Sequence, residues 1–217
     1  GIVAHVNKIT PYNPTEYMIV DSATRKNLEL FERMSDKGSD GTLYWVLDKT
    51  VSSMGGRLLK RWILEPLLNI EKIKERQEGV EELLKDYILR SEIREMLSEL
   101  SDFERISGKI GCKSVNARDL IALKNSLKEI PKIKKALKDI SAKILADVTE
   151  GLNEIKPVIE LIENNIEENP PLSLKEGNLI KDGVNEELGS LRNISRGGKE
   201  WIAKFQEDER KRTGIGS

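Results

Sequence analysis

The sequence predicts a mainly all-α protein built from several helices, and three observations lead to this fold class. Charged residues make up 34% of the 217 residues and aromatic residues only 5%. Such a composition, rich in Lys, Glu, Leu and Ile, is typical of well-solvated helices. Apolar residues recur at three- and four-residue spacing over most of the chain, and side chains that can cap helices precede several of these stretches.

The N-terminal part predicts a connector followed by a short helix and a loop. Prolines oppose a helix in residues 1–20, so this segment is expected to be extended. Asp21 can cap a short helix over residues 23–31. The polar, glycine-containing segment 36–41 is expected to be a loop.

Helical patterns then follow one another to about residue 140. The expected N-caps are Asn69, Ser91 and Asn116. Asp119 completes a capping-box arrangement with Asn116. Pro131 is expected to begin a further turn, since proline is tolerated at a first helical position. The apolar stripes lie in residues 43–47, 58–64, 70–87, 93–100 and 120–130.

The longest apolar stripe lies in residues 141–167. Pro157 falls inside it, so a kink or a break near residue 153 is expected. Its members are Ile144, Val148, Leu152, Ile155, Ile159, Ile162 and Ile166.

The residue pattern of the sequence changes after the run Asn169–Pro171, which is the best candidate for a boundary between two regions of the chain. Residues 173–183 contain two glycines and short alternating apolar residues, and they predict an extended segment or hairpin. Residues 185–192 and 200–212 predict two further helices.

The sequence offers no constellation for catalysis or metal binding. His5 is the only histidine and Cys112 the only cysteine, so a zinc site cannot be assembled. A single cysteine excludes an internal disulfide and fits a reducing compartment. Cys112 is expected to be a small, semi-buried side chain. The adjacent carboxylates stand in polar runs, so solvated faces are favoured over a catalytic pair.

Two glycine pairs invite a phosphate-binding interpretation. The segment Gly197–Lys199 fails as a phosphate-binding loop because Asn193 replaces the required glycine and Glu200 the required Ser or Thr. The segment Met54–Gly56 precedes a helix, where an anion can bind. We favour close packing of two backbones there. No cofactor site is therefore expected in this chain.

Neither a membrane span nor a signal peptide is predicted. The sequence has no run of 18 apolar residues, and its start lacks the charged and apolar regions of a signal peptide. It also lacks an initiator Met. Both ends are therefore expected to be cuts inside a longer protein.

Six blocks of sequence occur in a fixed order across nearly the whole chain. Each block alone is weakly specific, but their order and spacing together are strongly so. The blocks are Tyr17–Leu30, Gly41–Thr50, Val51–Pro66, Asp102–Ile106, Ala117–Leu127 and Asp208–Ile215. This ordered set resembles the core, or lever, domain of the MutS family of DNA mismatch-repair ATPases.

The resemblance implies a domain organisation. Residues 1–20 would be the end of a connector segment and residues 21–168 the helical core or lever domain. Residues 169–217 would be the start of a clamp domain, with a small partial α/β segment. The family's mismatch reader and its ATPase domain, which binds ATP and Mg, have no counterpart here. The chain by itself is therefore expected not to be an enzyme.

The resemblance also implies a mechanical function, in which the lever couples DNA binding to the distant ATPase domain. The implied partners are double-stranded DNA, a second copy in the parent protein and a MutL-type repair protein, in the cytoplasm and nucleoid if the source is bacterial. The basic residues after residue 169 supply candidate phosphate contacts, which carry no sequence information. The candidates are Lys175, Lys181, Arg196 and Lys199.

Two further expectations complete the interpretation. A helical protein–protein interaction scaffold with no DNA role is the alternative function, because apolar stripes and balanced charge fit it equally well.

In the family, the antiparallel partner of residues 144–166 would return from beyond Ser217. Leaving each Ile or Val exposed costs about 1.5–3 kcal/mol. Self-association through this stripe is therefore expected, and Ile155→Glu with Ile159→Glu should yield monomers.

Overall fold

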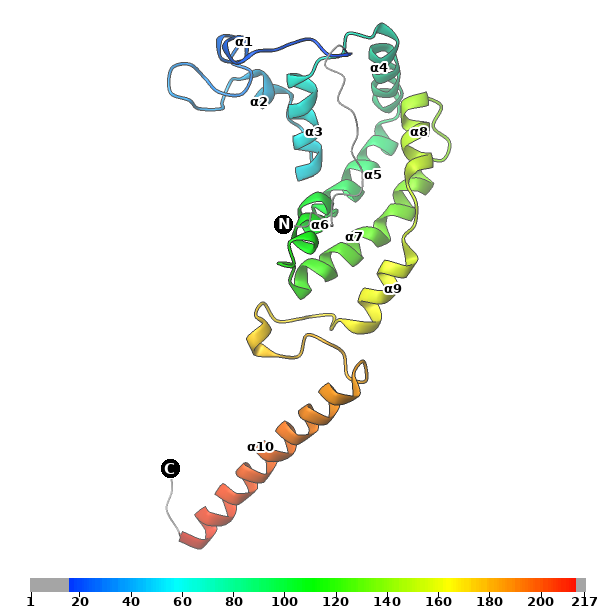
Figure 1. Cartoon of the computed structure of the whole chain (residues 1–217). Coiled ribbons are helices and arrows are strands. Elements are labelled where there is room, and N and C mark those ends of the chain that lie inside the picture. The colour runs from blue at the N-terminus through cyan, green and yellow to red at the C-terminus, as the bar shows by residue number, and fades with distance from the viewer. Residues whose placement is uncertain (1–15, 214–217) are drawn as a thin grey trace.

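The computed structural model describes residues 16–213, and over this range the chain is a mainly all-α protein (Figure 1). The β-pairing in the described range consists of two isolated antiparallel bridges, Tyr17 with Leu67 and Ile166 with Ile180. The predicted fold class is confirmed. The small α/β segment expected after residue 169 is not seen in the described residues, because residues 173–183 pair with the chain through a single bridge.

The described helices run in chain order from a compact N-terminal group to a long C-terminal helix. They are α1 (Ser22–Asn27), α2 (Leu43–Leu47), α3 (Ser53–Leu64), α4 (Ile70–Lys85), α5 (Tyr87–Ser98), α6 (Phe103–Gly111), α7 (Ala117–Ala136), α8 (Lys143–Gly151), α9 (Lys156–Asn165), the 3-10 helix η2 (Leu174–Glu176) and α10 (Glu186–Thr213).

Several helices begin where the sequence places a capping side chain. Asp21 accepts a hydrogen bond from the backbone of α1, and Asn69 from that of α4. At the start of α7, Asn116 Oδ1 accepts from the Asp119 N–H at 2.8 Å, and Asp119 Oδ2 accepts from the Asn116 N–H at 3.2 Å. These bonds satisfy N–H groups that a helix start leaves open. The predicted caps at all three sites are confirmed.

Two predicted helix starts are wrong. Ser91 lies inside α5, because Asp86 accepts from the Leu89 N–H at 2.9 Å and starts the helix earlier. Pro131 lies inside α7 and does not begin a new turn. Proline removes only one helix hydrogen bond. The burial of Ile133 in the core just beyond it favours continuation of the same helix.

The long apolar stretch 141–167 is broken, as expected, into α8 and α9. Leu152–Ile155 separate the two helices, and Pro157 occupies the first turn of α9. Ala142, the N-cap of α8, has no capping side chain. Glu82 of α4 holds the backbone just before α8, since its carboxylate accepts from the Ser141 N–H at 2.7 Å and the Ala142 N–H at 2.6 Å.

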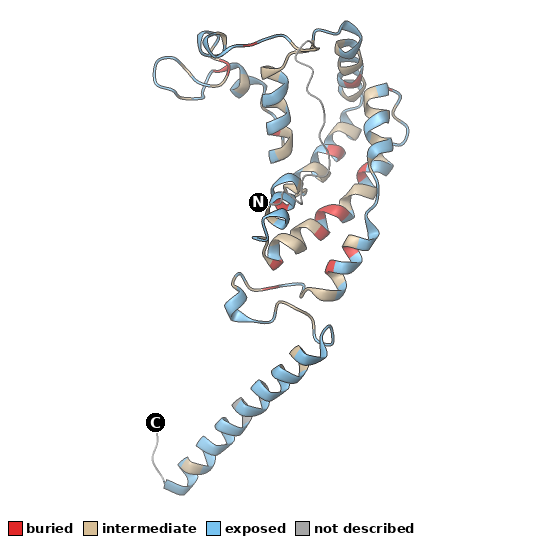
Figure 2. Cartoon of the chain, in the orientation of Figure 1, coloured by how far each residue is buried: buried red, intermediate tan, exposed pale blue. Residues whose placement is uncertain are grey.

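The core forms around α7, which packs against α5, α6 and α9 (Figure 2). Ile93 of α5 meets Ile133 of α7 in the buried cluster, and Ile159 and Ile162 of α9 are buried as well. The expectation that the stripe in residues 144–166 lacks a partner within the chain is therefore wrong for its second half. Ile159→Glu would place a charge in this core.

Among the described helices, α10 is the longest, and its large apolar side chains are exposed. The two helices expected at residues 185–192 and 200–212 are one helix of 28 residues. Asn185 Oδ1 accepts from the Leu188 N–H at 2.8 Å and opens it. The helix passes through the glycine pair without a break. Its large apolar side chains are exposed, and these are Leu191, Ile194, Trp201, Ile202 and Phe205.

Candidate functional site

The four candidate phosphate contacts lie on three segments, which are η2, the segment after it and α10. Lys175 is exposed on η2, and Lys181 follows the bridge residue Ile180. Arg196 and Lys199 lie in α10, and their side chains are outside the described part. Because they are three positions apart, the helical backbone places their Cα atoms on one face of the helix. Of the four side chains, only those of Lys175 and Lys181 are described, and they belong to separate segments.

Lys181 lies near carboxylates of α9 and the segment after it. The hydrogen bond from Lys128 is the main cause that lowers the pKa of Glu163, and Lys124 does the same for Glu168. Lys181 adds a smaller electrostatic contribution at both carboxylates. Its charge is therefore partly neutralised within the chain, and Lys175 is the more available of the two for an anion.

A row of basic side chains on α7 binds the segment that leads toward α10. Arg118 Nε donates to the Pro170 carbonyl at 2.9 Å, and Lys124 Nζ contacts Glu168 Oε1 at 3.0 Å. Lys128 pairs with Glu163. We call these three contacts the α7 ladder. They run in opposite directions along the two segments, so α9 returns antiparallel to α7.

Lys124 is the buried member of the α7 ladder, with 3% of its surface exposed. A buried ammonium group is costly unless a partner neutralises it, and Glu168 supplies that charge. The described side chains contain no buried polar atom without a hydrogen-bond partner. The ladder is therefore a structural joint, and its cations are already paired.

The joint continues from the ladder to the start of α10. The Glu167 N–H donates to the Leu179 carbonyl and the Lys181 N–H to the Asn165 carbonyl, both at 2.9 Å. Arg192 of α10 then donates from Nη2 to the Ile180 carbonyl at 2.8 Å and pairs with Asp182. Contacts thus run without interruption from α7 to α10.

Sequence reasoning missed this joint. Arg192 appeared only as one of several basic residues, and the partners of Lys124 and Arg118 lie 44 and 52 positions away in sequence. Regular spacing reveals partners three or four residues apart on one helix. Pairs across helices depend on how the helices pack, so no local signal identified them.

The remaining motifs have structural explanations. A Cβ added at Gly56 would lie 3.2 Å from Tyr44 Oη, so this glycine leaves room for side chains and not for a second backbone as expected. Gly197 and Gly198 lie within a helix and form no phosphate-binding loop. Cys112 is exposed and not semi-buried, because it follows the last residue of α6 at the surface.

Two negative findings apply to residues 16–213. No group of three or more His, Cys, Asp or Glu side chains in this range is arranged to hold a metal ion. Across the same range, no helix combines the length and the apolar character needed to span a bilayer.

Comparison with known proteins identifies the chain's relatives. A family model described as MutS domain III matches residues 23–213. The DNA mismatch repair protein MutS of Symbiobacterium thermophilum is 46% identical over 215 residues, which cover 99% of this chain and 25% of that protein. The protein of the same name in Halothermothrix orenii is 47% identical over 213 residues, which cover 98% of this chain and 24% of that protein. The one in Bacillus subtilis is 45% identical over 213 residues, which cover 98% of this chain and 25% of that protein.

The chain thus spans about a quarter of the length of these relatives. The domain III match runs through residue 169 without a division, so the boundaries at residues 20 and 168 stay predictions. Both the match over most of the chain and the identity above 40% support one conclusion. The chain belongs to the MutS family of DNA mismatch repair proteins, as a segment that matches domain III.

Proposed function

We propose that this chain is the lever of a MutS-type mismatch-repair protein, coupling a clamp on the DNA backbone to a distant ATPase domain. The carrying observation is the continuous joint from the α7 ladder through the Ile166–Ile180 bridge to Arg192 of α10. Such a joint transmits a displacement of the core helices to α10, because paired charges and backbone bonds resist local bending.

The dimensions of the helices support a lever. At 1.5 Å per residue, the 20 residues of α7 extend for about 30 Å and the 28 residues of α10 for about 42 Å. In Figure 1, α10 projects away from the packed helices.

Contact with DNA is proposed through phosphates only, at Lys175, Lys181, Arg196 and Lys199. The formal net charge of −1 favours weak binding, because 37 acidic residues balance the 36 basic ones and phosphate contacts are limited to a few local cations. Binding is then sensitive to salt and indifferent to mismatches. No residue of this chain is proposed to turn over ATP.

The other properties of the whole protein are part of the same proposal. ATP and Mg would bind in an ATPase domain outside this chain, and the parent would act as a homodimer together with a MutL-type partner in the bacterial cytoplasm. The second candidate, a protein-interaction scaffold without a DNA role, is favoured by one observation. Trp201 and Phe205 stack at 5.3 Å on the exposed face of α10, as an interaction surface would present them.

Fluorescence anisotropy with labelled matched and mismatched duplexes tests the DNA contact. Replacing the four candidate residues with Ala should weaken binding and flatten its dependence on salt. A matched control replaces Lys26, Lys37, Lys113 and Lys138 with Ala, which removes the same charge from exposed positions before residue 169. Equal losses in both variants, or a tenfold preference for the mismatched duplex, would contradict the proposal.

Coupling is tested separately in a full-length protein that contains this chain. Arg192→Ala should uncouple DNA binding from ATP turnover, so that duplex DNA changes the turnover rate less than in the unaltered protein. Lys211→Ala removes a cation that pairs with Glu207 on the same helix and serves as the control. Unchanged stimulation by DNA in the Arg192 variant would overturn the lever proposal. Saturable ATP turnover by the 217-residue chain alone would show that it contains an ATP site.

A further inference from the structure

Residues 16–68, which we call the head, form a unit with its own small core. Leu30 and Thr42 are buried there, and the rings of Phe31 and Tyr44 lie 5.7 Å apart. The backbone adds bonds within the head, since the Tyr44 N–H donates to the Leu30 carbonyl at 3.0 Å. The head is thus held together by its own contacts.

The head joins the body, residues 69–170, with little apolar contact. Helix α3 packs closely only against α2 among the described helices. Leu58 is 49% exposed and Trp62 38% exposed on α3. The guanidinium of Arg76 lies 3.8 Å from the centre of the Trp62 ring, close to the covalent connection between α3 and α4.

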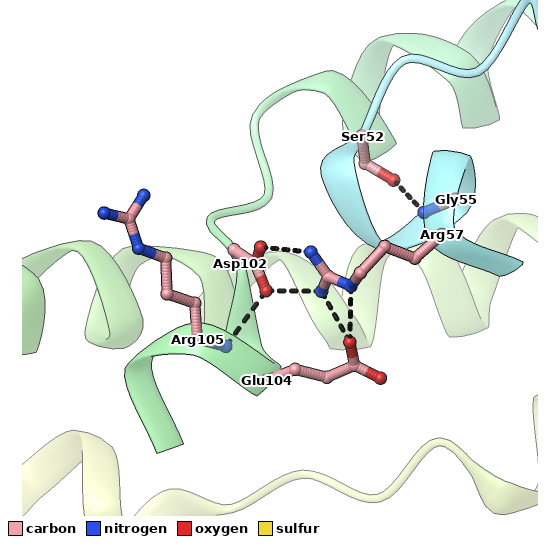
Figure 3. Close-up of polar contacts among 6 residues, drawn as sticks. All are labelled: Ser52, Gly55, Arg57, Asp102, Glu104 and Arg105. Atoms are coloured by element: carbon pink, nitrogen blue, oxygen red, sulfur yellow. Dashed lines mark hydrogen bonds and ion pairs between the residues drawn. The ribbon is translucent and has the colours of Figure 1, made fainter. Parts of the chain in front are cut away.

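The opposite end of α3 is attached by charge. Arg57 places Nη1 2.7 Å from Asp102 Oδ2 and Nη2 2.7 Å from Asp102 Oδ1, while its Nε donates to Glu104 Oε2 at 2.8 Å (Figure 3). We call this contact the latch. Paired bonds of this kind fix an orientation as well as a distance, so the latch can define how the head sits on the body.

The latch also joins two helix starts. Ser52 caps α3 by accepting from the Gly55 N–H at 3.2 Å, and Asp102 caps α6 by accepting from the Arg105 N–H at 3.1 Å (Figure 3). A carboxylate is stabilised at a helix N-terminus. Arg57 is the main cause that lowers the pKa of Asp102 to about 2, so this acceptor stays charged at neutral pH.

One further bond reinforces the same end of α3. Arg94 Nη1 of α5 donates to the Lys49 carbonyl at 2.8 Å. This bond has a neutral acceptor, so it is weaker than the bidentate pair of Arg57 with Asp102. At the end of α3 that leads into α4, the head is linked by the chain itself and by the pair of Lys72 with Glu16 at 2.8 Å. At the other end of α3 it is linked mainly electrostatically.

We propose that the head is a hinged unit, whose orientation on the body is set by the latch of Arg57 with Asp102 and Glu104. Residues 65–69 are the hinge. Because the latch is polar and partly exposed, ionic strength or a competing charged group can open it while both units stay folded. This hinge and its latch do not depend on the proposed contact with DNA.

Spin labels measure the orientation directly. Cys112 is the only cysteine of the chain and is exposed on the body, and Lys26→Cys adds an exposed site on α1 of the head. Double electron–electron resonance should give a narrow distance distribution at low salt. Arg57→Ala should broaden it at least twofold. Arg33→Ala, which removes a cation of the head that pairs with Asp36 at 2.8 Å, should leave the width unchanged.

Near-UV circular dichroism of the head's tryptophans shows whether the head of the Arg57→Ala protein is still folded. Two further conditions disturb the latch without removing Arg57. Glu104→Gln weakens the latch but keeps the Asp102 cap. In 1 M NaCl the Debye length falls to about 3 Å. Both conditions should broaden the distribution. The proposal is overturned if a folded Arg57→Ala protein keeps the original width, or if neither Glu104→Gln nor 1 M NaCl changes it.

Discussion

Helices α7 and α10 are both long and both carry apolar stripes, yet one is the centre of the core and the other is exposed. In α7, Leu127 and Ile133 are buried, and the helix packs against α5, α6 and α9. In α10, Trp201 and Ile202 are more than half exposed. An amphipathic pattern thus predicts that a helix forms, but it does not specify which surface covers the apolar side.

The charged residues of the two helices differ in the same way. Lys124 of α7 pairs with Glu168, 44 residues further along the chain. In α10, Lys211 pairs with Glu207 on the next turn of the same helix. Exposed pairs within one helix contribute about 0.3–0.5 kcal/mol. Contacts across segments are thus what distinguish α7 from α10.

Truncation of an apolar side chain should give the largest contrast between the two helices. Ile133→Ala removes atoms from a packed core and is expected to lower the free energy of unfolding by about 2–5 kcal/mol. Ile202→Ala removes atoms already exposed, so the change should stay within about 0.5 kcal/mol. Urea denaturation followed by circular dichroism compares them. Equal losses would mean that α10 is covered in solution.

Replacing a glycine with alanine should destabilise the protein in the body but stabilise it in α10. A Cβ at Gly79 of α4 would lie 2.8 Å from Ile144 Cγ2, whereas one at Gly197 has no neighbour within 4 Å. Gly79→Ala should destabilise by about 1–3 kcal/mol through overpacking. Gly197→Ala should stabilise α10 by about 0.5–1 kcal/mol. Helix content and thermal unfolding measure both, and a loss of stability from Gly197→Ala would reveal a close neighbour.

The capping box of α7 should have a moderate effect. Asn116→Ala removes the acceptor for the Asp119 N–H and is expected to destabilise by about 1 kcal/mol. Asn153→Ala is the matched control, because Asn153 is exposed in the break between α8 and α9. The midpoint of urea unfolding provides the comparison. Equal shifts in the two variants would contradict a specific capping contribution.

Acid should weaken the body through its carboxylates, with a small effect from each. Lys124 is the main cause that lowers the pKa of Glu168 below its ordinary value of 4.5. A carboxylate with a lowered folded-state pKa stabilises fully above its unfolded-state pKa, and this contribution is lost as pH falls through the folded value. Thermal unfolding should therefore occur at lower temperature below about pH 4.5, and less steeply with pH in Glu168→Gln. An unchanged slope in this variant would argue against the pair.

Much of the fold was predictable because its signals are local. The caps at Asp21, Asn69 and Asn116 act within three residues, and Pro157 is accommodated in the first turn of α9, where proline is tolerated. The prediction of an N-cap at Ser91 was wrong because serine also occurs inside a helix that has already begun. Ordered blocks of sequence were enough to predict the family, and the match to domain III bears this out.

The candidate site was only partly predictable. Sequence supplied Lys175, Lys181, Arg196 and Lys199 as candidate phosphate contacts, but nothing local indicates that Lys181 lies near the carboxylates of Glu163 and Glu168. The latch of Arg57 was equally hidden, because Asp102 and Glu104 follow it by 45 and 47 residues.

The sequence by itself therefore determined the helices, their caps, the break before α9 and the membership of the MutS family. These features depend on residues within a few positions of one another or on their order along the chain. Only the tertiary structure decided which stripe became core, which lysine was buried and where the head is attached. Those outcomes depend on distances between segments far apart in sequence, and such distances are set by the packing of the helices as a whole.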